Sequence, residues 1–132
     1  MEATNEQLIR DIIDNWAKAV RAKDIDGILA HHSPNILLFD VPDPVVQSKG
    51  IDAYRESWEQ VFYSWYGDDG GFEVTELNIT AGNDIAFATG IIHCSGTDKG
   101  IKVHIKVRLT IGLKRIDGQW VIVHEHHSEA AK

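Results

Sequence analysis

The sequence has one cysteine, three prolines, no long apolar run and no excess of basic residues. Because Cys94 has no partner in the chain, no intrachain disulfide can form, which favours a reducing compartment. No apolar stretch approaches the ~20 residues of a membrane-spanning helix, and residues 1–15 lack the basic-then-apolar order of a signal peptide. Thirteen Lys and Arg against twenty Asp and Glu give a net charge of −7. Nucleic acid and anionic membranes need a basic surface, so we expect neither as a partner and place the protein in the cytoplasm.

The remaining composition is that of an ordinary globular protein. The chain has 132 residues, of which 43% are apolar and 25% charged. A chain of this length buries enough surface for a hydrophobic core without disulfides or metals. We therefore expect a single domain over residues 1–132.

The first half of the chain has the apolar spacing of helices. Thr4 to Gln7 has the pattern of a capping box, and apolar residues then recur at helical spacing as far as Val20. The pattern predicts a short second helix through Leu29 that ends before Pro34, and a strand over residues 36–41 that leads into a turn at 41–44. A third helix is predicted to begin after Gly50 and to run to about Trp65.

Glycine-rich residues 67–71 separate these helices from a second half with the features of strands. The strand-like segments are joined by short, turn-rich connections; they are Phe72–Thr80, Ile85–Cys94, Ile101–Lys114 and Trp120–His127. Consecutive strands with short connections favour an antiparallel meander. Helices followed by strands predict an α+β fold with three N-terminal helices on one face of the sheet.

The last hairpin can be placed in register by its turn and its apolar pattern. A three-residue loop over 116–118 would put Leu113 beside Val121 and Leu109 beside Glu125, with Trp120 on the opposite face. A two-residue loop at 117–118 separates apolar from polar residues less cleanly, so we predict the longer loop. This register places Glu125 and His127 on the core face. There they either pair with each other at the rim of the sheet or line a ligand pocket.

Other residues have two interpretations as well. Asp40 interrupts an apolar strand, as either a turn cap or a base in a pocket. The large aromatic residues of the helices form either plain core or the wall of a pocket; they are Trp16, Tyr54, Trp58 and Phe62. His124 and His126 have the spacing of a metal chelate, but a metal would need a third ligand such as His104 or His93, and we predict no metal site.

Two segments resemble a known superfamily. Residues 22–28 (AKDIDGI) resemble the helix junction of ketosteroid isomerases and other nuclear-transport-factor-2-like (NTF2-like) proteins. Residues 117–128 (DGQWVIVHEHHS) are similar to the end of SnoaL-like proteins and of the calcium/calmodulin-dependent kinase association domain. The resemblance implies a cone-shaped fold with a curved, mainly antiparallel sheet.

The resemblance also assigns residues. The base aspartate of the isomerase falls on Asp40, and its helix-one tyrosine falls on Trp16, whose indole N–H is a weaker donor. No carboxyl group stands where the isomerase has its second acid, near residues 109–111. A pocket arginine of the kinase association domain is replaced by His127, and a pocket histidine of its third helix corresponds to Tyr54.

Two functions follow as hypotheses. The first is a cofactor-independent acid/base enzyme, of the isomerase, cyclase or hydratase type, in which Asp40 moves a proton and His127, oriented by Glu125, is its partner. Its small cyclic or aromatic ligand would lie among apolar side chains, namely Trp16, Tyr54, Trp58, Phe62 and Ile111. The second is a non-catalytic binding or assembly module. In either case we expect a homodimer through the outer face of the sheet, where the predicted register places Trp120, Ile122, Arg108, His124 and His126.

Overall fold

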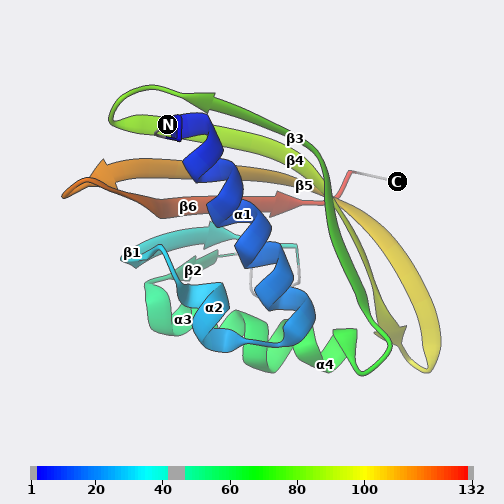
Figure 1. The fold of residues 1–132 in the computed structure, drawn as a ribbon. Helices are drawn as coiled ribbons and strands as arrows, with labels where there is room; N and C mark the ends of the chain where they lie inside the picture. Colours follow the sequence, from blue (N-terminus) through cyan, green and yellow to red (C-terminus); the bar gives the residue numbers. More distant parts are fainter. Residues whose placement is uncertain (1–2, 42–46, 131–132) are drawn as a thin grey trace.

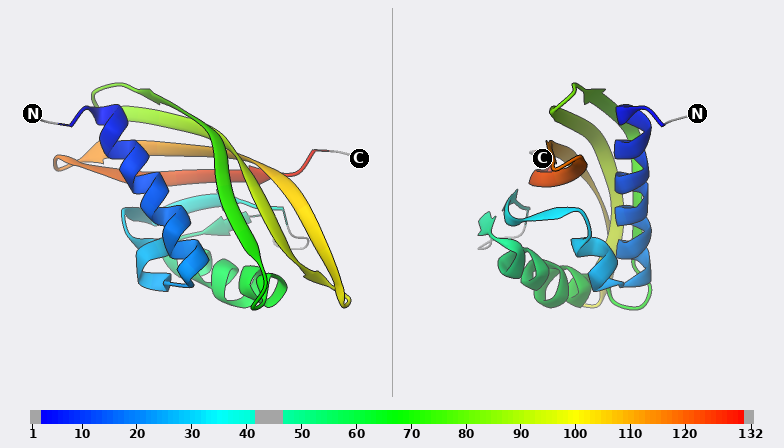
Figure 2. Two further views of the ribbon diagram at one scale, coloured as in Figure 1. Left: turned by 45° about the vertical axis from the view of Figure 1, so that its right-hand side comes forward. Right: turned by 60° about the vertical axis from the view of Figure 1, so that its left-hand side comes forward.

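The computed structural model describes residues 3–41 and 47–130, and it consists of helices packed on one side of a curved sheet (Figures 1 and 2). The helical elements are α1 (Asn5–Ala22), α2 (Ile25–Leu29), α3 (Ile51–Glu56), the π-helix η1 (Ser57–Phe62) and α4 (Tyr63–Tyr66). The strands are β1 (His32–Phe39), β2 (Gln47–Lys49), β3 (Gly71–Ala81), β4 (Ile85–Asp98), β5 (Ile101–Ile116) and β6 (Gln119–Ser128). The predicted α+β class is thus confirmed.

The helix boundaries follow from local capping. Thr4 accepts a hydrogen bond from the Gln7 backbone N–H at 3.1 Å, as the capping box predicts, whereas the Gln7 side chain donates to Asp11. Lys23 ends α1 in the left-handed conformation, and Asp24 then caps α2 through the N–H of Gly27. The apolar face of α1 is buried against the sheet.

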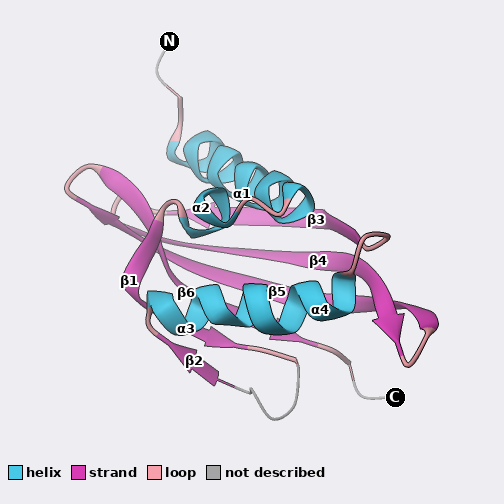
Figure 3. Cartoon of the chain, turned by 90° about the horizontal axis from the view of Figure 1, so that it is seen from below, coloured by secondary structure: helices cyan, strands magenta, loops and turns pink. Residues whose placement is uncertain are grey.

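The six strands form one sheet in the order β2-β1-β6-β5-β4-β3. All pairs are antiparallel except β1 with β6, which are parallel. The strands β3, β4 and β5 bend so that their far ends approach α4, and the helices lie in front of the sheet when it is seen from below (Figures 1 and 3). The concave side of this sheet holds the core.

Two details of the N-terminal half differ from the prediction. Strand β1 begins at His32 and contains Pro34, which lies where the pairing with β6 shifts between His32 and Leu37. The missing N–H of proline is tolerated there because the ladder is interrupted. The short strand β2 was not predicted, and the predicted turn at 41–44 lies largely outside the described residues.

The predicted register of the last hairpin is wrong. The loop has two residues, Asp117 and Gly118, and both have positive φ (50° and 79°), as a primed hairpin turn requires. Leu113 therefore pairs with Ile122, and Trp120 and Ile122 belong to the core rather than to the outer face. A two-residue loop without any other irregularity would mix apolar and polar residues on each face of β6. A bulge further along β6 restores the separation.

The bulge lies at Val123, between the pairs Leu113–Ile122 and Gly112–His124. One extra residue on β6 exchanges the two faces of the strand beyond it. Glu125 and His127 consequently enter the core beside Ile111 and Leu109, as the sequence predicted, although through a different register.

None of the helices in the described part of the chain combines the length and apolar character needed to cross a bilayer.

The burial of Trp120 can be tested by mutation. Its indole is 3% exposed and donates to Asn5 Oδ1 of α1 at 3.2 Å. We expect Trp120→Ala to lower the free energy of unfolding by about 3–5 kcal/mol, because it leaves a large cavity. The control is Ile101→Ala, at a position 69% exposed, which should change stability by less than about 0.5 kcal/mol. Equal effects in urea unfolding would contradict the core position of Trp120.

Candidate functional site

A buried carboxylate lies at the centre of the candidate site. Glu125 is 0% exposed on β6, and three side chains from different elements surround it. The Tyr54 hydroxyl of α3 donates to its Oε2 at 2.8 Å, and His32 Nε2 of β1 lies 2.6 Å from the same oxygen. His127 Nε2 lies 3.0 Å from Oε1. Each carboxylate oxygen is thus satisfied, as a buried charge requires.

The network continues on both sides of Glu125. The Tyr54 hydroxyl accepts a hydrogen bond from Trp16 Nε1 at 3.0 Å, and His32 Nδ1 lies 2.9 Å from the carbonyl oxygen of Ala30. On the opposite side, His127 Nδ1 lies 3.6 Å from Asp40 Oδ1. Asp40 follows the end of β1, and the same oxygen accepts the Val41 N–H at 2.8 Å. The chain of polar contacts therefore leads from the core to Asp40.

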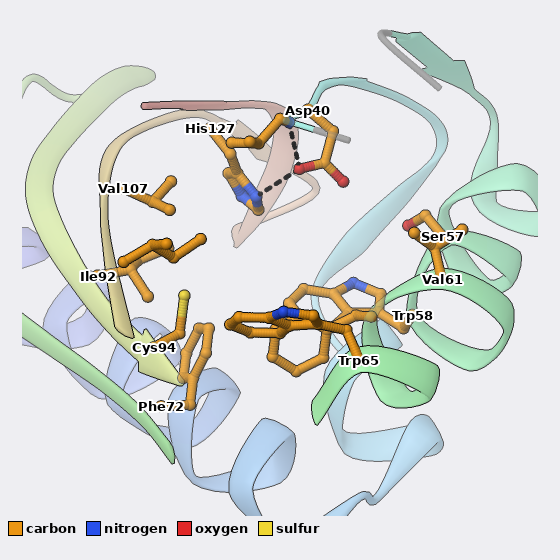
Figure 4. A pocket seen from close by; sticks show the side chains of 13 residues that line it. Asp40, Ser57, Trp58, Val61, Trp65, Phe72, Ile92, Cys94, Val107 and His127 are labelled. Atoms are coloured by element: carbon orange, nitrogen blue, oxygen red, sulfur yellow. Dashed lines mark hydrogen bonds and ion pairs between the residues drawn. The ribbon is translucent and has the colours of Figure 1, made fainter. Parts of the chain in front are cut away.

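Asp40 and His127 form one end of a cavity of about 220 Å³ (Figure 4). The rest of the wall is mainly aromatic and aliphatic and comprises Val41, Ser57, Trp58, Val61, Phe62, Trp65, Phe72, Ile92, Cys94, Ile105 and Val107. In Figure 4 the dashed lines at Asp40 end on one of its carboxylate oxygens, and none ends on the other. An apolar cavity with a few convergent polar groups is the usual form of a small-molecule site.

The helical wall of this cavity has an unusual geometry. Residues 57–62 form a π-helix, in which the Tyr63 N–H bonds to the Trp58 carbonyl. Such segments are rare and are frequent at functional sites. Trp65 of α4, which also lines the cavity, lies against Gly96 of β4, where an added Cβ would stand 2.3 Å from the indole ring. The absence of a side chain at Gly96 leaves room for this indole.

The network sets the charges of its members. Burial opposes the ionised forms of both Glu125 and His127. Hydrogen bonds and charges from His127 and His32 nevertheless lower the pKa of Glu125 from 4.5 to about 2. Hydrogen bonds and charges from Asp40 and Glu125 raise the pKa of His127 from 6.5 to about 9. At neutral pH, Glu125 is therefore an anion and His127 an imidazolium.

Two other groups stay neutral. Burial, followed by the charge and hydrogen bond of Glu125, raises the pKa of Tyr54 well above 10, so that its hydroxyl remains a donor. Burial also raises the pKa of Cys94 to about 12, so its thiol is not an ionised nucleophile at neutral pH.

The structure brings most of the predicted residues together in two groups. Asp40, His127, Trp58 and Phe62 line the cavity, and Asp40 Oδ1 also accepts the Val41 N–H. Trp16, Tyr54 and Ile111 do not line it; they are buried behind it in the core. Glu125 contacts His127 from that side.

His32 was not among the predicted site residues, because the helical pattern before Pro34 places it at the end of a helix. His32 stands an even number of residues before Ile36 and Leu38, the buried residues of β1, and this spacing was the signal that the sequence offered for its buried side chain, although the strand is irregular between them. Pro34 concealed this signal. Of the two outer-face histidines, His124 Nδ1 lies 2.8 Å from the Leu37 carbonyl oxygen. Within residues 3–41 and 47–130, no three His, Cys, Asp or Glu side chains are grouped as metal ligands.

Comparisons with known proteins agree with this architecture. A family profile described as SnoaL-like domain matches residues 9–132. An NTF2-like protein of unknown function from Pseudomonas putida is 34% identical, with a TM-score of 0.82 over 94% of this chain and 85% of that one. None of the curated proteins matches this chain.

More distant structures share the fold. The CaMKII hub of S. rosetta is 19% identical, with a TM-score of 0.82 over 98% of this chain and 100% of that one. A hexachlorocyclohexane dehydrochlorinase, LinA-type3 from Novosphingobium barchaimii, is 15% identical, with a TM-score of 0.82 over 94% of this chain and 85% of that one. These matches confirm the predicted NTF2-like fold.

The pKa of His127 predicts how stability depends on pH. Its raised pKa contributes stability that is complete below about pH 6.5 and is lost as the pH rises through about 9. The lowered pKa of Glu125 contributes stability above about pH 4.5, and this is lost as the pH falls through about 2. The free energy of unfolding should thus be highest between about pH 4.5 and 6.5, where both contributions are complete.

The variant His127→Gln should lose the decline between pH 6.5 and 9, because glutamine does not titrate. The control His104→Gln, at an exposed position, should keep it. Urea unfolding at a series of pH values measures both variants. Parallel curves for the wild type and His127→Gln over this interval would show that His127 does not carry the proton.

Proposed function

This chain belongs to the SnoaL-like family, and we propose that it binds a small cyclic or aromatic molecule in the cavity and transfers a proton on it with Asp40 as the base. The observation that carries the proposal is the position of Asp40: a carboxylate beside a protonated imidazole, at the end of an otherwise apolar cavity. A general base needs this combination of access to the ligand and exclusion of water.

The cavity supports the ligand class. Its volume of about 220 Å³ suits a molecule of one or two rings, and four aromatic side chains contribute to its wall: Trp58, Phe62, Trp65 and Phe72. Aromatic rings pack well against flat apolar ligands. Because the polar groups Asp40 and His127 lie together, the reacting part of the ligand is expected beside them.

The three residues predicted to be catalytic, Asp40, His127 and Glu125, have distinct roles in this proposal. Asp40 takes the proton on the oxygen that neither Val41 nor His127 contacts. His127 is already protonated at neutral pH, so it acts as a fixed positive charge beside the base rather than as a second base. Glu125 does not face the cavity and acts through His127, which it orients. Return of the proton to another carbon of the ligand would be an isomerisation and needs no cofactor.

The assembly hypothesis has its own supporting observation. Ile85 and Phe87 of β4 are 66% and 50% exposed on the outer face of the sheet, opposite the helices. The predicted interface residues Trp120 and Ile122 are buried in the core, so Ile85 and Phe87 are the exposed apolar residues of this face instead. Burial of such residues against a second copy would support a homodimer, and a dimer is compatible with a working cavity.

Asp40→Asn tests the catalytic role. In D2O, a base in the cavity should exchange the protons next to the carbonyl of a bicyclic ketone such as 2-tetralone for deuterium, which mass spectrometry detects. Asparagine keeps the shape and an acceptor for Val41 but cannot take the proton. We expect exchange to slow by at least about 100-fold while ketone affinity stays within a few fold.

The control Asp98→Asn, at an exposed position of β4 outside the cavity, should exchange like the wild type. Wild-type exchange by Asp40→Asn would exclude Asp40 as the base. Ketone binding without any exchange by the wild type would favour the non-catalytic alternative.

A further inference from the structure

One donor in the cavity wall has no acceptor. Trp58 is 4% exposed, and its Nε1 is the only buried side-chain nitrogen or oxygen among the described residues without a hydrogen-bond partner. Figure 4 shows this nitrogen on the edge of the indole ring that faces Asp40 and His127 across the cavity. Buried polar groups are nearly always paired, so an unpaired one at a cavity calls for an explanation.

The other tryptophans differ from Trp58 in this respect. Trp16 Nε1 donates to Tyr54 and Trp120 Nε1 donates to Asn5, while Trp65 is only partly buried. Trp16, which the family resemblance suggested as a donor to the ligand, is therefore committed to the core. Of the two indoles that line the cavity, Trp58 has the buried, unpaired N–H.

The neighbouring Tyr54 does not satisfy this N–H. Its hydroxyl accepts from Trp16 and donates to Glu125, and the nearby Trp58 N–H lowers the pKa of this hydroxyl without reaching hydrogen-bonding geometry with it. The rest of the cavity wall is mainly apolar. An acceptor atom on a bound ligand would satisfy the N–H.

We propose that Trp58 Nε1 donates a hydrogen bond to a carbonyl oxygen of the ligand, so that the cavity selects cyclic or aromatic ketones over hydrocarbons of the same shape. The selection between ligands concerns binding alone. Its catalytic consequence rests on the proposed function: when Asp40 takes a proton from the carbon next to the carbonyl, the C–H electron pair forms a C=C bond and the carbonyl oxygen becomes an enolate oxygen. The Trp58 N–H then stabilises the charge on that oxygen, as an oxyanion donor does.

The direct test observes the indole N–H by ¹H–¹⁵N correlation NMR. The four tryptophans give four indole signals, and the Trp58 signal is identified as the one absent from Trp58→Phe. Titration with 2-tetralone should move the Trp58 proton downfield, because hydrogen bonding to oxygen deshields it. Tetralin, which has the same two rings without the carbonyl, should bind without that downfield shift. Equal shifts with both probes, or binding of neither, would overturn the proposal.

A comparison of variants provides a second measurement. The wild type should bind 2-tetralone about tenfold more tightly than tetralin, the usual size of one neutral hydrogen bond. Trp58→Phe should lose this preference while still binding tetralin, whereas the matched control Trp65→Phe, which alters the other cavity indole, should keep it. A ketone preference that persists in Trp58→Phe would refute the role of this donor.

These outcomes are separable from those for Asp40. A ketone-specific shift of the Trp58 signal supports the inference even where Asp40→Asn exchanges deuterium like the wild type. Loss of exchange in Asp40→Asn without any ketone-specific shift at Trp58 would leave the base assignment in place and overturn the inference.

Discussion

A fully buried carboxylate is the constraint around which this structure is organised. Glu125 lies in the core, where an unpaired charge would be costly, and it is tolerated because Tyr54, His32 and His127 together contact both of its oxygens. These three residues come from α3, β1 and β6. The pairing therefore ties a helix to two neighbouring strands, and loss of any one partner leaves part of the charge unsatisfied.

The same network determines the chemistry at the end of the cavity. By holding His127 between two carboxylates, it keeps the imidazole charged at neutral pH and places it beside Asp40. The cavity thus presents a carboxylate with a fixed cation on one side and aromatic rings on the other. The polar groups behind the wall connect to the cavity only through these two residues.

The hydrogen bonds of the indole N–H groups distinguish two tryptophans that look alike in the sequence. Trp16 and Trp58 are both buried aromatic residues on helices, and both were predicted pocket residues. Trp16 satisfies its N–H in the core through Tyr54, whereas Trp58 faces the cavity with its N–H unpaired. Which of the two can contact a ligand depends on hydrogen bonds between residues that are 38 positions apart in the chain. Such long-range pairings cannot be read from helical periodicity.

Local patterns were enough to predict the α+β class, the capping of α1, the four long strands and the inward position of Glu125 and His127. They succeed because capping, periodicity and alternation depend on residues a few positions apart. The predicted register of β6 was wrong because the turn is one residue shorter than predicted and the bulge at Val123 adds one residue to the strand. A pattern of alternation does not show such a bulge. His32 was missed because Pro34 is a strand breaker except where the ladder is already interrupted. By itself, then, the sequence determined most of the helices and strands and pointed to most of the polar residues of the candidate site, but not to β2 or His32. Only the tertiary structure decided which of them meet, because the contacts of Glu125 and Asp40 depend on packing between distant segments.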